Sequence, residues 1–317
     1  MPQEIIGHEK ILSFLEKSLK NGQLSHAYLF VGAHGLGKTA VAEWLIKKVL
    51  GEVGFEHPDV SVLNRLTDEK TGKLKSEIVV DQVRKLRERL AMSGFIGGHK
   101  FAFIEDADVL NTEASNALLK TLEEPAQKTT LILRVSSLDR VLPTVASRCQ
   151  ILRFTSVPRL KIVAALAKRG TIKKEAEALA ALSAGRPGYA FRLLRNEETR
   201  SLEETSVQQF LEIFQLPTYA RLSKAVDWLP KDEVNKKEQL KDLLDRFEWL
   251  LRDTLLLSAG VGDLALRSIA YPEIINLAKT KDTNHWLKAT EILREVKKNL
   301  ELNVNPTLVL EHLFLEL

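Results

Sequence analysis

The stretch Gly32-Ala33-His34-Gly35-Leu36-Gly37-Lys38-Thr39 decides the fold expected for this chain. It has the G-x-x-x-x-G-K-T pattern of a phosphate-binding loop, in which glycines let consecutive backbone N–H groups point at phosphate oxygens. The apolar run from residue 26 to 31 before it is typical of a buried strand. Val41, Trp44, Leu45 and Val49 recur after it at helical spacing. Strand, glycine loop and helix place a phosphate at a helix N-terminus.

The loop therefore predicts nucleotide binding. Lys38 supplies a positive charge for the β- and γ-phosphates, and the Thr39 hydroxyl is a ligand for Mg²⁺. The alternative is a relic loop that keeps its shape without its ligand. The predicted nucleotide-binding residues are Gly32, Ala33, His34, Gly35, Leu36, Gly37, Lys38, Thr39 and Ala40.

Outward from the loop, residues 1 to about 155 alternate strand-like and helix-like segments, which predicts an α/β layer fold with a parallel sheet. From about 156 onward the strand signals stop, and residues 205–317 are typical of longer helices. A leucine-rich stripe there predicts a helical core face. The predicted strands are Tyr28–Val31, Val60–Leu63, Ile78–Val80, Phe101–Ile104 and Leu131–Val135. The stripe consists of Leu240, Leu243, Leu244, Phe247, Leu250, Leu251 and Leu255.

Composition sets the compartment. The 317 residues are 44% hydrophobic and 28% charged, with a formal net charge of +4, as in ordinary globular proteins. No apolar run approaches the ~20 residues of a membrane span, and no signal peptide is indicated. The single cysteine, Cys149, excludes an intrachain disulfide and a cysteine-based zinc cluster. We expect a cytoplasmic protein with no membrane association and no zinc.

A second carboxylate, at the end of a neighbouring strand, is needed near the loop to hold Mg²⁺ through water. The segment Phe101-Ala102-Phe103-Ile104-Glu105-Asp106 supplies a hydrophobic strand and that acid, so Thr39 and Asp106 are the predicted metal ligands. A water-activating glutamate is expected directly after the aspartate, and that position is Ala107. Glu105 precedes Asp106, so strand alternation predicts that it points to the opposite face. Asp108 is not an obvious substitute for the missing water-activating glutamate.

Two further segments identify a family. Asn116-Ala117-Leu118-Leu119-Lys120-Thr121-Leu122-Glu123-Glu124-Pro125 and Ser147-Arg148-Cys149 closely resemble bacterial clamp-loader subunits of the AAA+ superfamily. With residues 26–30, the phosphate loop and His57-Pro58-Asp59, the resemblance covers most of the first 155 residues in order and spacing. It implies a P-loop AAA+ domain at 1–155, a small helical lid at 156–200 and an all-α oligomerisation collar at 201–317.

Within that family the chain is more similar to the delta-prime type than to the gamma/tau motor. Ala107 lacks the glutamate, and Gly188 stands where motor subunits place a lid arginine. The stretch 183–188, the segment Asn303-Val304-Asn305-Pro306 and the leucine-rich helix after it also resemble delta-prime chains. The resemblance implies weak or absent ATPase activity of its own.

The resemblance makes Arg148 the functional centre. In the family, the S-R-C arginine projects into a neighbour's nucleotide site, as an arginine finger in trans worth roughly 10³–10⁵ in rate in well-studied systems. Read from the residues alone, Arg148 is a surface ion pair. The resemblance also assigns Ile5, Ile6 and His8 to an adenine pocket and Ser136 to a polar sensor.

Partners follow from the same resemblance. They are the delta and gamma/tau subunits in a hetero-pentamer, and through that complex the sliding clamp and primed DNA, with ATP or ADP and Mg²⁺ as cofactors. Arg84, Lys85, Arg87 and Arg89 form a basic helix face that could contact DNA phosphates, although a solvated face is the simpler interpretation. Two alternatives stay open: an autonomous gamma/tau-type motor, and a helicase-loader-type AAA+ protein.

Overall fold

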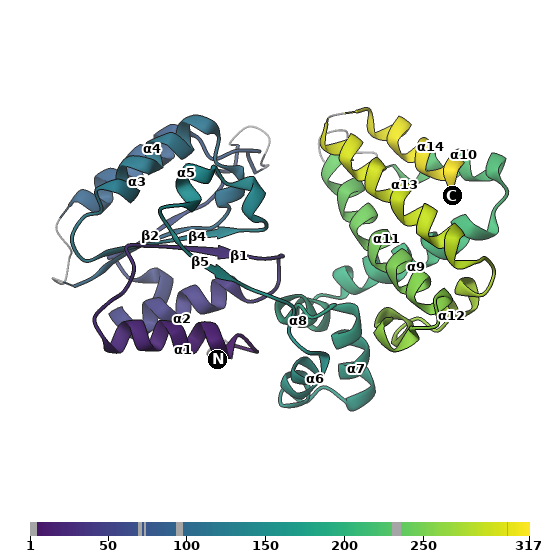
Figure 1. Cartoon of the computed structure of the whole chain (residues 1–317), viewed down its shortest axis with the longest axis horizontal. Coiled ribbons are helices and arrows are strands. Elements are labelled where there is room, and N and C mark those ends of the chain that lie inside the picture. Colours follow the sequence, from purple (N-terminus) through teal and green to yellow (C-terminus); the bar gives the residue numbers. More distant parts are fainter. Residues whose placement is uncertain (1–4, 69–71, 73, 93–97, 230–235, 303) are drawn as a thin grey trace. The chain divides into compact units, whose positions relative to one another are not determined.

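The computed structural model describes residues 5–68, 72, 74–92, 98–229, 236–302 and 304–317, and its chain forms two compact units (Figure 1). The first unit comprises Met1–Ile162 and Gly185–Tyr189. The second comprises Val163–Ala184 and Ala190–Leu317. The residues predicted as a lid, 156–200, are thus divided between the two units. The three-domain division stays a prediction.

The first unit is built on a five-stranded parallel sheet in the order β2-β3-β4-β1-β5. Its central strands are buried on both faces, which explains why they are continuous apolar runs. The strands are β1 (Ala27–Val31), β2 (Val60–Leu63), β3 (Lys100–Ile104), β4 (Thr129–Val135) and β5 (Gln150–Arg153).

Helices cover both faces of this sheet (Figure 1). Tyr28 and Phe30 pack with α1 (Glu9–Lys20) and α2 (Lys38–Leu50). Leu29 and Val31 alternate with them and pack toward the opposite face. The elements on that face are α3 (Val80–Ala91), α4 (Thr112–Glu123) and α5 (Pro143–Ala146), and the 3₁₀ turns of the unit are Gly54–Glu56, Ala107–Val109 and Leu138–Arg140.

Four of the five predicted strands are confirmed, and the prediction of a strand at Ile78–Val80 is wrong. Ile78 makes one isolated bridge to Leu110. The Gln82 side chain then accepts a hydrogen bond from the Val79 N–H at 3.2 Å, and this cap starts helix α3 at Val80. Strand β5, a short strand with two exposed residues at the sheet edge, was not predicted.

The second unit has its own helical core. Helix α11 carries the predicted leucine stripe, whose residues are buried except for the partly buried Leu255. Fully buried Trp286 on α13 shares this core. The helices after the sheet are α6 (Arg159–Ala167), α7 (Lys173–Leu182), α8 (Pro187–Arg195), α9 (Glu197–Gln215), α10 (Thr218–Trp228), α11 (Lys236–Ser258), α12 (Glu273–Ala278), α13 (Thr283–Glu301) and α14 (Pro306–Glu316), with 3₁₀ turns at Gly262–Leu264 and Arg267–Ile269.

The described part of the chain contains no strand after β5, as the sequence predicts. Among the described helices, none combines the length and the apolar character that crossing a membrane requires.

Candidate nucleotide site

The glycine loop lies between the end of β1 and the start of α2, at the carboxyl edge of the sheet. Gly32, Gly35 and Gly37 have φ values of 149°, 82° and 99°, which only glycine adopts readily. At Gly37 a Cβ would meet nothing within 4 Å, so the loop is open there. The 13-residue helix α2 begins at Lys38, directly after the loop. This arrangement fits a phosphate group.

The Lys38 side chain folds back onto its own loop. Its ammonium group donates hydrogen bonds to the carbonyl oxygens of Gly32 and Ala33, the latter at 2.8 Å. Only 4% of Lys38 is exposed. Burial, helped by the nearby charge of Arg134, lowers the pKa of Lys38 to about 8.

Arg134 on β4 contacts the two predicted metal ligands together. Ile132 faces the α1 and α2 side, and alternation places Arg134 on that same face, beside Phe30 of β1. One guanidinium nitrogen donates to the Thr39 hydroxyl at 2.9 Å. The other terminal nitrogen donates to the Asp106 carboxylate at 2.8 Å.

Glu105 contacts the same guanidinium. Its carboxylate lies 3.0 Å from an Arg134 nitrogen, and its backbone carbonyl accepts from Arg134 Nε. The prediction that Glu105 points to the opposite face is therefore wrong. Strand β3 ends at Ile104, so the alternation of a strand no longer applies to Glu105. Arg65 approaches Asp106 from another element, with 3.4 Å between Nε and the carboxylate.

Asp108 and the predicted sensor Ser136 form a second polar pair. The backbone N–H of Ser136 donates to the Asp108 carboxylate at 3.2 Å, and its hydroxyl donates to the same oxygen. Burial opposes the ionisation of Asp108, but these hydrogen bonds outweigh it and hold its pKa below the ordinary value. Asp108 is consequently a weak base. Ala107 is 3% exposed and packs in the core on the α3 and α4 side.

Residues 185–189, which include the first three residues of α8, lie against the glycine loop. The Gly188 N–H donates to the Gly35 carbonyl at 2.8 Å, and a Cβ on Gly188 would stand 3.1 Å from that oxygen. Arg186 lies over the Tyr189 ring, 4.7 Å from its centroid. The position predicted to lack the motor arginine is thus a close backbone contact with the phosphate loop.

The N-terminal segment also reaches the loop. A ring nitrogen of His8 hydrogen-bonds to the Leu36 carbonyl at 2.8 Å, and the ring packs on Phe154. Burial lowers the pKa of His8. Ile5 packs against the core that includes Leu36. The structure therefore brings residues assigned to the adenine pocket to the loop, while their contact with adenine stays a prediction.

Arg148 lies on the other side of the sheet. It follows α5, which packs with α4, whereas Lys38 starts α2 on the opposite face. Its guanidinium is 2.7 Å from the Glu123 carboxylate and donates to the Thr144 carbonyl at 3.0 Å. The side chain remains 37% exposed. The surface ion pair that the residues alone predict is thus present in the single chain.

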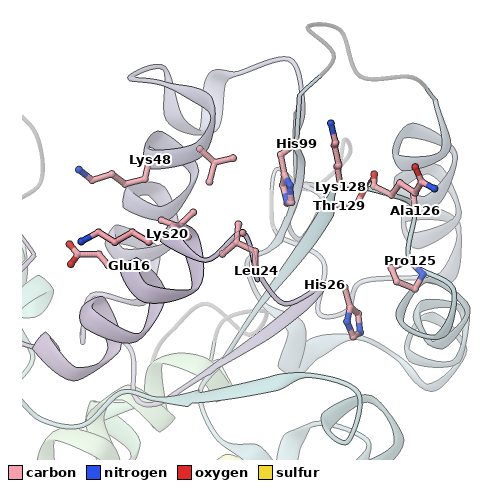
Figure 2. Close-up of a pocket in the computed structure, with 14 residues that line it drawn as sticks. Glu16, Lys20, Leu24, His26, Lys48, His99, Pro125, Ala126, Lys128 and Thr129 are labelled. Carbon is pink, nitrogen blue, oxygen red and sulfur yellow. Dashed lines mark hydrogen bonds between the residues drawn. The ribbon is translucent and has the colours of Figure 1, made fainter.

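A separate pocket of about 890 Å³ opens at the amino ends of the strands (Figure 2). Its lining includes His26 before β1, His99 before β3 and Thr129 at the start of β4, together with Lys20 and Lys48 from the helices. The nucleotide loop lies at the opposite edge of the sheet, where the strands end. This pocket is therefore not part of the predicted nucleotide site.

The observed geometry does not favour Mg²⁺ binding by the two predicted metal ligands. As the side chains lie, Thr39 and Asp106 do not fit Mg²⁺, because the Arg134 guanidinium already donates to both. Within the residues that the structure describes, no group of three or more histidine, cysteine, aspartate or glutamate side chains could hold a metal ion. Arg134 is a site residue that was not predicted, although an arginine inside the apolar run 131–135 is a signal that could have revealed it.

The fold and the loop define a P-loop protein of the AAA+ class. In agreement, the solved gamma-subunit-related protein of DNA polymerase III from Thermotoga maritima has a similar fold. The TM-score is 0.52 at 17% identity, and the match covers 95% of this chain and 97% of that protein.

Sequence comparison finds similarity to subunits of DNA polymerase III. The family described as DNA polymerase III, delta subunit matches residues 7–158. The delta' subunit of Bacillus subtilis strain 168 is 27% identical over 324 residues, covering 97% of this chain and 95% of that protein. The delta' subunit of Pseudomonas aeruginosa PAO1 is 36% identical over 191 residues, covering 54% of this chain and 56% of that protein. By these matches the chain resembles the delta' subunits of DNA polymerase III over almost its whole length.

Proposed function

We propose that this chain is the stator of a bacterial replicative clamp loader and that it supplies Arg148 to the nucleotide site of a neighbouring ATPase subunit. Its own loop holds ATP or ADP as a structural or regulatory ligand. The assembly is a hetero-pentamer with delta and gamma/tau subunits in the cytoplasm, and it places the sliding clamp on primed DNA.

The position of Arg148 carries this proposal. The side chain is partly exposed and follows a short helix on the sheet face away from Lys38, so it does not serve its own phosphate loop. Its partners, Glu123 and the Thr144 carbonyl, hold the guanidinium at the surface. A planar cation presented in this way suits the γ-phosphate of a neighbour.

The chain's own site supports weak turnover. Ala107 provides no carboxylate, Asp108 is tied to Ser136 with a lowered pKa, and Gly188 provides no lid cation. A general base works best with a pKa near the operating pH, and Asp108 is shifted away from it. These features disfavour the autonomous gamma/tau-type motor, which would hydrolyse ATP as an isolated chain.

Arg148→Ala in the reconstituted complex tests the proposal. We expect hydrolysis at the interface that receives Arg148 to fall by roughly 10³-fold or more, with a parallel loss of clamp loading. The matched control is Glu123→Gln, which removes the local ion-pair partner and leaves the arginine in place. We expect that variant to keep most of its clamp loading, because the arginine itself is unchanged and the Thr144 carbonyl still binds its guanidinium. If the Arg148→Ala complex loads clamps at the wild-type rate, the trans role is refuted. Arg148 would then serve only in its local ion pair.

A further inference from the structure

Arg134 joins two groups that a P-loop site keeps for a divalent cation. Its guanidinium donates to the Thr39 hydroxyl at 2.9 Å and to the Asp106 carboxylate at 2.8 Å. Thr39 lies in the first turn of α2, and Asp106 follows the end of β3. The planar Arg134 guanidinium thus connects the start of α2 with the residues that follow the end of β3.

The same oxygens cannot serve the guanidinium and Mg²⁺ at once. Mg²⁺ requires near-octahedral oxygen ligands at about 2.0–2.1 Å. The guanidinium, which donates to both oxygens at 2.8–2.9 Å, already fills the space between them where such an ion would lie. The charges are also matched without a metal, because Glu105 and Asp106 face the two cations Arg134 and Arg65. A further dication would be repelled by both guanidinium groups.

The guanidinium is held firmly in this position. Arg134 projects from the sheet-centre strand β4, and its side chain is only 16% exposed. Besides Thr39 and Asp106, it binds the carboxylate and the backbone carbonyl of Glu105. Moving it aside would leave two carboxylates less well paired in a partly buried site.

We propose that Arg134 takes the position of Mg²⁺, so that this site binds a nucleoside di- or triphosphate without a divalent cation. The loop N–H groups, the Lys38 ammonium and the Arg134 guanidinium then supply the donors for the phosphates. This inference rests on the proposed nucleotide binding and is independent of the trans role of Arg148. It also gives a reason, separate from Ala107, for weak hydrolysis.

The test measures the affinity of the full-length chain for a fluorescent ADP analogue, with Mg²⁺ and with EDTA. We expect the wild-type dissociation constants to agree within about threefold. In Arg134→Gln, we expect binding in EDTA to weaken by about tenfold or more, and added Mg²⁺ to restore it, because the two oxygens become free for the metal. Arg65→Gln is the matched control: it also removes a cation from Asp106 but leaves the Arg134 fork in place, so its binding should stay independent of Mg²⁺.

Contrary outcomes are well defined. Wild-type binding that tightens about tenfold with Mg²⁺ would overturn the proposal, and so would an absence of binding under both conditions. If Arg134→Gln fails to fold, Asp106→Asn decides. If the site used Mg²⁺, Asp106→Asn would lose the part of its affinity for the ADP analogue that depends on Mg²⁺. We expect instead that Asp106→Asn, like the wild type, binds the analogue equally well with Mg²⁺ and with EDTA. The assembled-complex test of Arg148 reads out the proposed function separately.

Discussion

Cys149 directly follows Arg148, and its chemistry is set by the core beneath it. The thiol packs against the cluster on the α3 and α4 face of the sheet. Burial raises its pKa to about 12, from an ordinary value of 9.0. The S-R-C motif therefore combines an exposed arginine with an inert thiol, so the cysteine has a packing role rather than a chemical one.

This shift predicts slow thiol labelling. At pH 8 the native thiol is therefore ionised to a much smaller extent than the thiol of the unfolded chain. Alkylation should slow by a smaller factor than the thiolate fraction falls, because a thiolate of higher pKa is the stronger nucleophile. Because the folded pKa is raised, the folded state keeps its proton while the unfolded state ionises, so the free energy of unfolding falls between pH 9 and 12.

Cys149 is the single cysteine in the chain, so iodoacetamide labelling followed by mass spectrometry reads it directly, with the chain in denaturant as the control. Equal rates in native and denatured samples would contradict the burial of the thiol.

At the scale of the elements, residues 185–189, which lead into α8, meet the glycine loop in a close backbone contact. Two backbones meet there, with the Gly188 N–H bound to the Gly35 carbonyl. A side chain on either glycine would push the segments apart, since a Cβ on Gly35 would stand 3.2 Å from the Tyr189 nitrogen. Gly188, the position predicted to match the lid arginine of motor subunits, makes a packing contact in this structure.

Gly188→Ala should therefore destabilise the α/β unit. The added Cβ lies 3.1 Å from the Gly35 carbonyl oxygen, and overpacking of this kind costs about 1–3 kcal/mol of unfolding free energy. Denaturant unfolding followed by circular dichroism measures it. Gly98→Ala is the control, because its Cβ would approach nothing closer than 3.8 Å. If the two variants have similar free energies of unfolding, the backbone around Gly188 accommodates the added Cβ without loss of stability.

At the scale of the whole molecule, each unit has its own buried core. The helical unit adds a buried ion pair between Arg267 and Glu203, 3.0 Å apart and 2% and 1% exposed. Arg267 also reaches the Leu182 carbonyl at the end of α7, and its backbone N–H donates to Asp253 on α11. Burial raises the pKa of Asp253. One arginine thus connects three segments distant in sequence.

Glu203→Gln should destabilise the helical unit by about 3–5 kcal/mol, because it leaves the Arg267 charge buried without its partner. Thermal unfolding of the full chain measures the loss. The matched control, Glu212→Gln, breaks the exposed pair with Lys224, 2.8 Å apart, and should leave stability nearly unchanged. A loss in Glu203→Gln no larger than in that control would contradict this role for the pair.

Much of the fold was predictable because local residue patterns indicate its strands and helices. Apolar runs revealed β1 to β4, and leucine spacing revealed α11, since burial selects such patterns directly. The prediction of a strand at 78–80 was wrong because a run of three apolar residues does not distinguish an isolated bridge from a strand. Strand β5 was missed because its edge position leaves half of its residues polar and exposed.

The sequence by itself determined the phosphate loop, the absence of a carboxylate at Ala107, the resemblance to clamp-loader subunits and the position of Arg148 in its motif. These depend on residue identity and short spacings. Only the tertiary structure decided what surrounds the loop. Arg134 meets Thr39 across 95 residues, and Gly188 meets Gly35 across 153, because neighbouring parallel strands and a returning turn bring them together. Such contacts follow from sheet order and backbone packing, which no local pattern encodes.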